Sequence, residues 1–267
     1  MRVATIQFDI ITGDVEGNRA KAEQYLRQAA AEGAELALLP ELWNCGYILP
    51  ELDRVAETLQ GPTVRFLQKL AAELKMYIVG GSIAELRDGN YYNTSVLVDP
   101  NGDMLKKYRK SHLFKLGLHE KDYFTAGNDW ALWDLPEIRL GMTICYDLRF
   151  PELNRNLSLR GARLFTCPTQ WPTSRVEDMH LFLRVRAMEN HSFYINANAC
   201  GYDAYNKLQY PGRSTIVSPL GKVILEAPAD PGAYVADLDF ELLEKAKSID
   251  VFADRRRILD EIDDNML

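Results

Sequence analysis

The chain has 267 residues, of which 47% are hydrophobic and 26% are charged, a composition typical of a globular protein that buries a large core. Its net charge is -7, and Lys and Arg are scattered among Asp and Glu, so no continuous basic face is available for phosphates and we expect no nucleic-acid partner. No apolar run approaches the ~18 residues that span a bilayer, and the first residues lack a signal-peptide pattern, so we expect no membrane partner.

Short β-branched runs alternate with amphipathic stretches in the first half of the chain. We predict strands at residues 2–8, 36–40 and 76–81, and helices near residues 17–32 and 62–75. This order is typical of an α/β fold. The second helix is predicted from apolar residues that recur on one face at helical spacing, namely Val64, Leu67, Leu70, Ala71 and Leu74.

A predicted hairpin follows, and the whole pattern then recurs. Residues 100–102 (Pro-Asn-Gly) separate two strand-like runs, which favours a tight turn. Residues 95–102 share their Ser, Val, Pro and Gly spacing with residues 214–221. Shared Gly, Pro and Trp positions could also arise by chance, but several matching segments in the same order favour a repeat. The longest match pairs Gly33, Ala34, Leu36, Pro40 and Trp43 with Gly161, Ala162, Leu164, Pro168 and Trp171.

Each half is therefore predicted to form strand, helix, strand, helix and two further strands. A sheet of this kind carries helices on one face and is apolar on the other, so two halves are stabilised by packing sheet on sheet. We predict a four-layer α-β-β-α sandwich, built as one continuous α/β domain over residues 1–267 because no linker-like segment divides the chain. Cys145 aligns with Gln7, and Glu41 with Thr169, so the repeat predicts one asymmetric functional site.

Cys145 is a candidate nucleophile because it follows the strand-like run IRLGMTI and precedes Pro151, which suits the first turn of a helix. Ligands of open α/β sheets bind at the carboxyl ends of strands, although a cysteine that ends an apolar strand is also a common core residue. We interpret Cys167 and Cys200 as core residues. Cys45, in the loop WNCGY, is interpreted as a structural or pocket residue.

Two charged residues also follow strand-like runs. Pro40 cannot extend a central strand, so Glu41 is predicted at the rim of the sheet, either as a solvated loop charge or directed into a site. Lys110 closes the run MLKKYRK, and its position alone favours a surface charge.

Neither a metal nor a nucleotide cofactor is expected. The histidines form no metal-binding spacing, and the chain has no phosphate-binding glycine loop. The cysteines form no CxxC pair, which argues against a disulfide framework and favours a reducing, cytoplasmic location. The eight residues concerned are His112, His119, His180, His191, Cys45, Cys145, Cys167 and Cys200.

Three segments resemble the nitrilase superfamily. Residues 39–41 read LPE, residues 108–114 read YRKSHLF, and residues 141–153 read GMTICYDLRFPEL, in the order and at the separations of that superfamily. The resemblance covers nearly the whole chain, including residues 186–190 and 214–221. Three motifs in one order are far more specific than any one of them.

The resemblance implies a sandwich of the nitrilase type and a catalytic triad with Glu41 as general base, Lys110 as the cation beside the tetrahedral intermediate, and Cys145 as nucleophile. Glu120 matches a second glutamate that would orient the substrate and Lys110, although it would otherwise be an unremarkable loop residue. We expect the nearby cation and the helix-terminal N–H groups to lower the pKa of Cys145. Lys110 and the N–H of Tyr146 would stabilise the oxyanion, and the mechanism needs no cofactor.

Within the superfamily, the chain is most similar to omega-amidases, which implies hydrolysis of a short dicarboxylate monoamide such as 2-oxoglutaramate. Trp171 would line the pocket, with core packing as an equal alternative, and Arg175 would hold the free carboxylate of the substrate. Gln170 stands where some close relatives have glutamate, which leaves the substrate preference open.

Other functions remain open at this point. The same triad could hydrolyse an N-carbamoyl amine or amino acid, and nitrile hydrolysis is a weaker alternative. The fold could also serve as a non-catalytic binding protein, or as a flavodoxin-like nucleotide binder without the usual phosphate loop. By resemblance we expect a homodimer, or a higher homo-oligomer, that associates through the helical layer.

Overall fold

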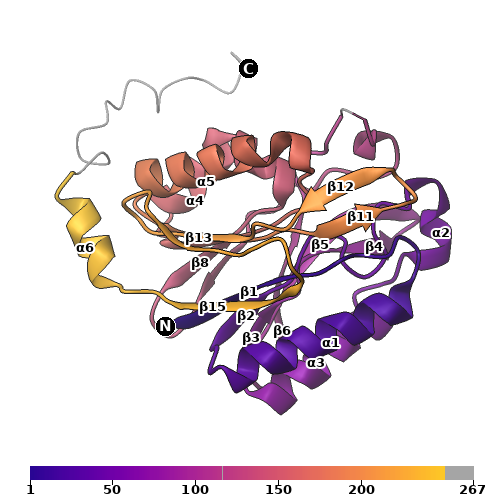
Figure 1. Cartoon of the computed structure of the whole chain (residues 1–267), viewed down its shortest axis with the longest axis horizontal. Helices are drawn as coiled ribbons and strands as arrows, with labels where there is room; N and C mark the ends of the chain where they lie inside the picture. The colour runs from indigo at the N-terminus through magenta and orange to yellow at the C-terminus, as the bar shows by residue number, and fades with distance from the viewer. Residues whose placement is uncertain (116, 250–267) are drawn as a thin grey trace.

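Two sheets form the centre of the molecule in a computed structural model that describes residues 1–115 and 117–249 (Figure 1). The predicted single domain over residues 1–267 ends outside the described residues and stays a prediction. The first half contains β1 (Arg2–Gln7), α1 (Val15–Ala31), β2 (Leu36–Leu38), η1 (Leu49–Glu51), α2 (Leu52–Val55), α3 (Pro62–Leu74), β3 (Tyr77–Val79), β4 (Ile83–Arg87), β5 (Asn90–Val98), β6 (Met104–Arg109) and η2 (Glu120–Asp122).

The second half repeats the same order of strands and helices with a few additions. It contains β7 (Leu132–Asp134), β8 (Arg139–Met142), η3 (Cys145–Arg149), α4 (Pro151–Leu159), β9 (Leu164–Pro168), η4 (Thr173–Arg175), α5 (Val176–Asn190), β10 (Phe193–Ala197), β11 (Cys200–Asp203), β12 (Leu208–Pro211), β13 (Thr215–Val217), β14 (Val223–Glu226), β15 (Gly232–Asp237) and α6 (Glu241–Lys247).

The predicted helices and the hairpin of the first half lie within two residues of their expected positions. Helix α1 begins earlier than residue 17 because the Asp14 side chain caps it, accepting a hydrogen bond from Gly17 N at 3.0 Å. Helix α3 has Pro62 in its first turn and ends where Lys75 adopts a left-handed conformation. The hairpin joins β5 to β6, and Gly102 supplies its positive φ of 90°.

The topology of the two sheets confirms the internal repeat. The first sheet has the order β15-β1-β2-β3-β5-β4, with β6 paired to β5, and the second has the order β14-β13-β10-β9-β8-β7. Strands β1, β2 and β3 are parallel, as are β8, β9 and β10, and each set is followed by antiparallel strands. The hairpin β11–β12 is an insertion that only the second half carries.

Successive side chains of a strand point to opposite faces of the sheet, so neighbouring residues join different hydrophobic clusters. On β1, Val3 belongs to the cluster shared with the second sheet, and its neighbour Ala4 belongs to the cluster under α1 and α3. On β2, Leu36 and Leu38 likewise belong to the first cluster, and Ala37 between them to the second. Each strand is therefore buried on both faces, which explains its nearly continuous apolar sequence.

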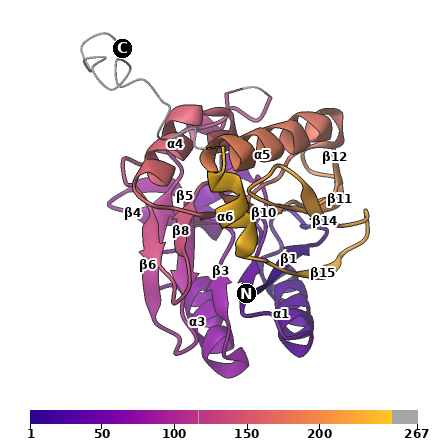
Figure 2. The same ribbon diagram turned by 90° about the vertical axis from the view of Figure 1, so that its left-hand side faces the viewer.

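The four layers are visible in two views. Helices α1 and α3 lie outside the first sheet, and α4 and α5 lie outside the second (Figures 1 and 2). The sheets pack on one another through β1, β2 and β10. The predicted α-β-β-α sandwich is therefore confirmed. Among the described residues, no helix has both the length and the apolar character that crossing a bilayer requires.

Candidate active site

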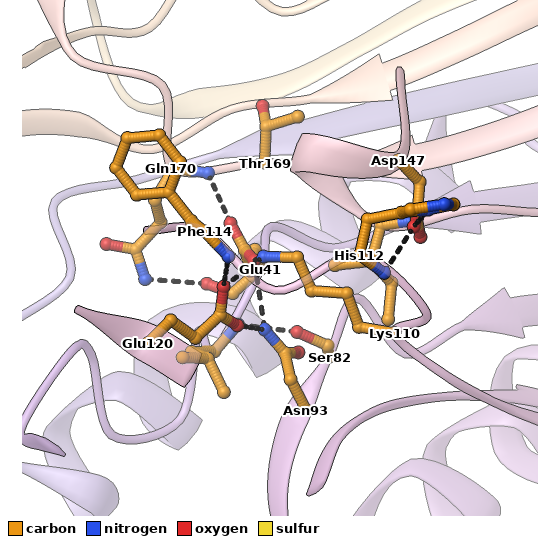
Figure 3. A network of polar contacts seen from close by, with 12 residues as sticks. Glu41, Ser82, Asn93, Lys110, His112, Phe114, Glu120, Asp147, Thr169 and Gln170 are labelled. Atoms are coloured by element: carbon orange, nitrogen blue, oxygen red, sulfur yellow. Dashed lines mark hydrogen bonds and ion pairs between the residues drawn. The ribbon is translucent and has the colours of Figure 1, made fainter. Parts of the chain in front are cut away.

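Glu41, Lys110 and Glu120 form a fully buried charge cluster at the carboxyl edge of the first sheet. The Lys110 ammonium lies 2.7 Å from Glu41 Oε1 and 2.7 Å from Glu120 Oε2, and all three side chains are 0% exposed (Figure 3). Lys110 is therefore not the surface charge that its position alone favours, and Glu120 is not an exposed loop residue. Two carboxylates share one cation, which leaves a net negative charge that only further donors can offset.

Strand pairing places Lys110 in this cluster. It follows the last residue of β6, and its N–H donates to the carbonyl of Asn93 at 2.9 Å, which continues the β5–β6 ladder by one residue. On the other side, Gly127 N donates to the Lys110 carbonyl at 2.9 Å. A Cβ at Gly127 would collide with the carbonyl oxygen of Arg109, so only glycine allows this approach.

Neutral donors complete the coordination of both carboxylates. Asn93 Nδ2 donates to Glu41 Oε1 at 3.0 Å and to Glu120 Oε1 at 2.8 Å, so one amide bridges the pair. Gln170 N donates to the remaining Glu41 oxygen at 3.0 Å, and Phe114 N donates to Glu120 Oε2 at 2.8 Å. Nothing in the sequence distinguishes Asn93 from the other polar residues of β5, namely Asn90, Thr94 and Ser95, and no pattern indicates the two backbone donors.

Cys145 is the first residue of η3, at the turn that follows strand β8. Ile144 is extended, and Cys145 has φ 46°, a left-handed conformation that is unfavourable for a residue with a Cβ. Pro151 then opens α4. The turn directs the thiol out of the strand, and Cys145 is 9% exposed, whereas Cys167 in the neighbouring strand is fully buried. All four cysteines lie in the described residues, free and buried. The cytoplasmic location inferred from them stays a prediction.

The charges of the cluster and of Cys145 depend on one another. Burial raises the pKa of Glu120 and the Glu41 carboxylate raises it further, while Lys110 lowers it, and the net shift is upward. Burial lowers the pKa of Lys110, but the Glu120 and Glu41 charges outweigh that effect, so its pKa lies well above the usual range. Lys110 is therefore held as an ammonium ion.

The expected lowering of the Cys145 pKa is wrong. Burial raises the pKa of this thiol, and the neighbouring Glu41 carboxylate raises it further, which together outweigh the lowering effect of Lys110. The sequence indicated the cation but not the depth of burial or the carboxylate beside the sulfur. The resting residue is consequently a neutral thiol that has Glu41 as its nearby proton acceptor.

A cavity of about 370 Å³ opens onto Cys145. The predicted residues Tyr146, Trp171 and Arg175 all line it, together with Gln170. Trp171 is only 4% exposed and also belongs to the hydrophobic core. It therefore both lines the pocket and packs in the core, the two alternatives that the sequence left open. A cavity of this size suits a small organic molecule.

Sequence reasoning missed two further residues of the cavity wall. Tyr47 is 3% exposed, and burial together with the Glu41 charge raises its pKa well above the usual range. Arg149 lies four residues after Cys145 and stacks over Trp171, with 5.2 Å between the guanidinium carbon and the ring centre. Its place in the quoted motif is the one signal that could have identified it. Within the described ranges, no group of three His, Cys, Asp or Glu side chains is arranged to hold a metal ion.

Known proteins are similar to this chain over nearly its whole length. The sequence profile of the carbon-nitrogen hydrolase family matches residues 2–248. A 2-oxoglutaramate amidase from Bacillus subtilis (strain 168) is 34% identical over 258 residues, which are 96% of this chain and 98% of that protein. An omega-amidase from Homo sapiens is 33% identical over 263 residues, which are 96% of this chain and 95% of that protein.

A solved structure shows the same arrangement of elements. A mutant of the nitrilase-superfamily amidase from Nesterenkonia sp. AN1, captured after Michael addition of acrylamide at its active-site cysteine, aligns with a TM-score of 0.84 at 27% identity. The alignment covers 100% of both chains. Profile, full-length relatives and fold thus agree with the motifs read from the sequence, and the chain belongs to the carbon-nitrogen hydrolase family of the nitrilase superfamily, enzymes that hydrolyse carbon–nitrogen bonds.

Proposed function

We propose that the protein is an omega-amidase, which releases ammonia from a short dicarboxylate monoamide such as 2-oxoglutaramate through a thioester on Cys145. The names of its full-length relatives support this substrate class. The observation that carries the mechanism is the buried cluster in which the Lys110 ammonium lies 2.7 Å from both Glu41 and Glu120, next to a thiol that lines a small cavity.

The first half of the reaction forms the thioester. The Cys145 sulfur attacks the amide carbonyl carbon while its proton passes to Glu41, which has the thiol as a neighbour. The carbonyl oxygen becomes an oxyanion, stabilised by the Lys110 ammonium and the N–H of Tyr146, and one such donor contributes about 3 kcal/mol. The carbon–nitrogen bond then breaks, and the proton on Glu41 passes to nitrogen, so ammonia leaves.

The second half consumes water and restores the enzyme. Glu41 takes a proton from a water molecule that attacks the thioester carbon, and the same donors stabilise the second oxyanion. The carbon–sulfur bond then breaks, Cys145 recovers its proton from Glu41, and the dicarboxylic acid is released. Glu120 accepts hydrogen bonds from the Lys110 ammonium and from Phe114 N, and its role is to keep the ammonium in position.

Two arginines in the cavity wall support an acidic substrate. Arg149 donates to Asp178 at 3.0 Å, so part of its charge is already paired. Arg175 also lines the cavity, and its guanidinium has no ion-pair partner in the part of the chain that the structure describes. Arg175 is therefore the better candidate for the free carboxylate of the substrate, which a guanidinium binds through two parallel hydrogen bonds.

The test is ammonia and carbon dioxide release from a panel that includes 2-oxoglutaramate, glutaramate, succinamate and N-carbamoyl-β-alanine. We expect ammonia without carbon dioxide from the three ω-amides. Release of both gases from the carbamoyl compound, with no turnover of the ω-amides, would replace this proposal by carbamoyl hydrolysis, the alternative that the same triad allows.

Arg175→Met provides a matched test of the acidic group. Loss of a charge-assisted hydrogen-bonding pair is expected to raise KM for glutaramate about tenfold to hundredfold and to leave the KM for butyramide, which lacks the carboxylate, nearly unchanged. An equal rise for both substrates would show that Arg175 does not bind the carboxylate.

We also propose that the protein forms a homodimer through the outer face of α5. Leu181, Val185 and Met188 are 60%, 40% and 53% exposed and recur at helical spacing on that face of α5, a helix that lies outside the second sheet (Figure 1). Exposed apolar stripes of this kind are typical of association surfaces. Sedimentation equilibrium of the wild type and of Leu181→Glu tests the proposal, because a wild type that stays monomeric at micromolar concentration would contradict it.

A further inference from the structure

A further buried carboxylate, which the proposed mechanism does not use, lies on the turn of the nucleophile. Asp147 is the third residue of η3, two residues after Cys145, and it is 0% exposed. Its main chain continues the turn, since Asp147 N donates to the Ile144 carbonyl at 3.0 Å and Asn154 Nδ2 donates to the Asp147 carbonyl at 3.2 Å. The side chain caps the start of its own helix at Ile144 N and also binds residues of another segment.

The Asp147 carboxylate accepts four hydrogen bonds. Oδ2 accepts from the Ile144 N–H at 2.9 Å and from the Tyr108 hydroxyl at 2.8 Å. Oδ1 accepts from the backbone N–H of His112 at 3.0 Å and lies 2.7 Å from Nδ1 of the same histidine (Figure 3). A carboxylate can only accept, so Nδ1 is the protonated ring nitrogen in this pair.

These donors flank both reacting groups. Tyr108 and His112 stand two residues before and two residues after Lys110, and Ile144 directly precedes Cys145. One carboxylate thus joins the segment of the ammonium to the turn of the thiol, which are 35 residues apart in the chain. The His112 ring also stacks on Phe150, just beyond η3, at 3.7 Å between ring centres and an interplanar angle of 9°.

We propose that Asp147 is a positioning residue that keeps the Cys145 turn and the Lys110 segment in one fixed arrangement, an inference that rests on the proposed roles of these two residues. The turn needs such a restraint, because Cys145 has the unfavourable φ of 46° and would relax without it. Relaxation would move the sulfur relative to the oxyanion donors, and a displacement of about 1 Å can cost roughly a hundredfold in rate.

The chain offers a matched control in Glu85. This carboxylate is 2% exposed and accepts hydrogen bonds from Arg109 Nε at 2.8 Å, from Arg109 Nη2 at 2.6 Å and from Thr94 at 2.7 Å. Like Asp147 it accepts several hydrogen bonds, and Arg109 directly precedes Lys110, but neither Arg109 nor Thr94 belongs to the Cys145 turn. Glu85→Gln therefore removes a buried carboxylate beside the same strand without loosening that turn.

The experiment compares Asp147→Asn with Glu85→Gln and the wild type, by kcat and KM for the best ω-amide, by the rate of iodoacetamide alkylation of Cys145, and by Tm. For Asp147→Asn we expect kcat to fall about tenfold to a hundredfold with KM within about threefold, and the alkylation rate to change at least about threefold at constant pH. For Glu85→Gln we expect a lower Tm than that of the wild type, with kcat and the alkylation rate close to the wild-type values.

Equal losses of kcat in the two variants, or an Asp147→Asn enzyme with wild-type kcat, would overturn the proposal. If Asp147→Asn fails to fold, Tyr108→Phe and His112→Phe each remove one donor and keep the ring, and unchanged kcat in both would equally overturn it. A wild type that hydrolyses no ω-amide would contradict the proposed substrate instead, because the alkylation rates report the position of Cys145 without any substrate.

Discussion

Replacing Lys110 by methionine should destabilise the protein by an amount that depends on pH. The ammonium lies 2.7 Å from Glu41 Oε1 and 2.7 Å from Glu120 Oε2, with no solvent exposure at any of the three side chains. Methionine has similar length and volume but no charge. The substitution therefore leaves two carboxylates buried side by side, bridged by the neutral amide of Asn93.

The magnitude follows from breaking a buried ion pair. Removal of one partner of such a pair costs about 3–5 kcal/mol at a pH where the remaining charge persists. At roughly 2–4 °C per kcal/mol for a chain of this size, Tm should fall by about 6–20 °C. The same variant should lose about a hundredfold or more in kcat, since one oxyanion donor contributes about 3 kcal/mol to the barrier.

The destabilisation should shrink in acid. The pKa of Glu120 is already raised in the folded protein, by burial first and by the Glu41 charge, and loss of Lys110 raises it further. The folded state then binds a proton at pH values where the unfolded carboxyl is ionised, so stability falls as pH rises above the ordinary glutamate pKa of about 4.3. The difference between Lys110→Met and the wild type should therefore be larger at pH 8 than at pH 5.

Urea unfolding at pH 5 and pH 8 measures this difference, and Lys107→Met serves as the control. Lys107 lies on β6, the strand that leads to Lys110. Its ammonium is 3.8 Å from Asp129 and its side chain is 28% exposed, so its loss should cost under about 1 kcal/mol. A Lys110→Met protein that unfolds at the wild-type urea concentration at pH 8, or whose deficit grows in acid, would refute the electrostatic reasoning.

Three further predictions concern the thiol and the general base. Cys145→Ala should keep its Tm and lose all ammonia release. Cys167→Ala, which changes a fully buried core residue, should keep most of its activity. Equal activities of the two variants would disprove the assignment of the nucleophile. Glu41→Gln should fold but give no measurable turnover, because an amide cannot accept the thiol proton. Iodoacetamide should label Cys145 in preference to the other cysteines. Because the pKa of this thiol is raised, the labelling rate should still rise between pH 7 and pH 9. A labelling rate that is already constant at pH 7 would show a stable thiolate instead.

The sequence predicted much of the scaffold because local patterns carry that information. Apolar spacing placed α1 and α3 within two residues, and residues 100–102 marked the turn between β5 and β6. The internal repeat predicted two similar sheets and hence four layers, because a sheet with one apolar face must bury it. What a repeat cannot predict is the insertion of β11 and β12, since no equivalent exists in the other half.

Position alone was a weaker guide to the functional residues. Lys110 reads as a surface charge, and Glu120 as an ordinary loop acid, until the resemblance assigns them roles. Arg149 was overlooked although it lies inside the quoted motif, because nothing local indicates that a side chain four residues after Cys145 lines the same cavity.

The sequence by itself determined the fold class, the repeat and the family, because each depends on residue types at fixed spacings along the chain. The tertiary structure alone decided the chemical state of the site, because the pKa of a buried group depends on desolvation and on neighbours from distant segments. Glu41 is held by Asn93, 52 residues away, and by Gln170, 129 residues away, and burial together with the Glu41 carboxylate raises the pKa of Cys145 where the sequence predicts a lowered one. Neighbours of that kind become known only when the chain is folded.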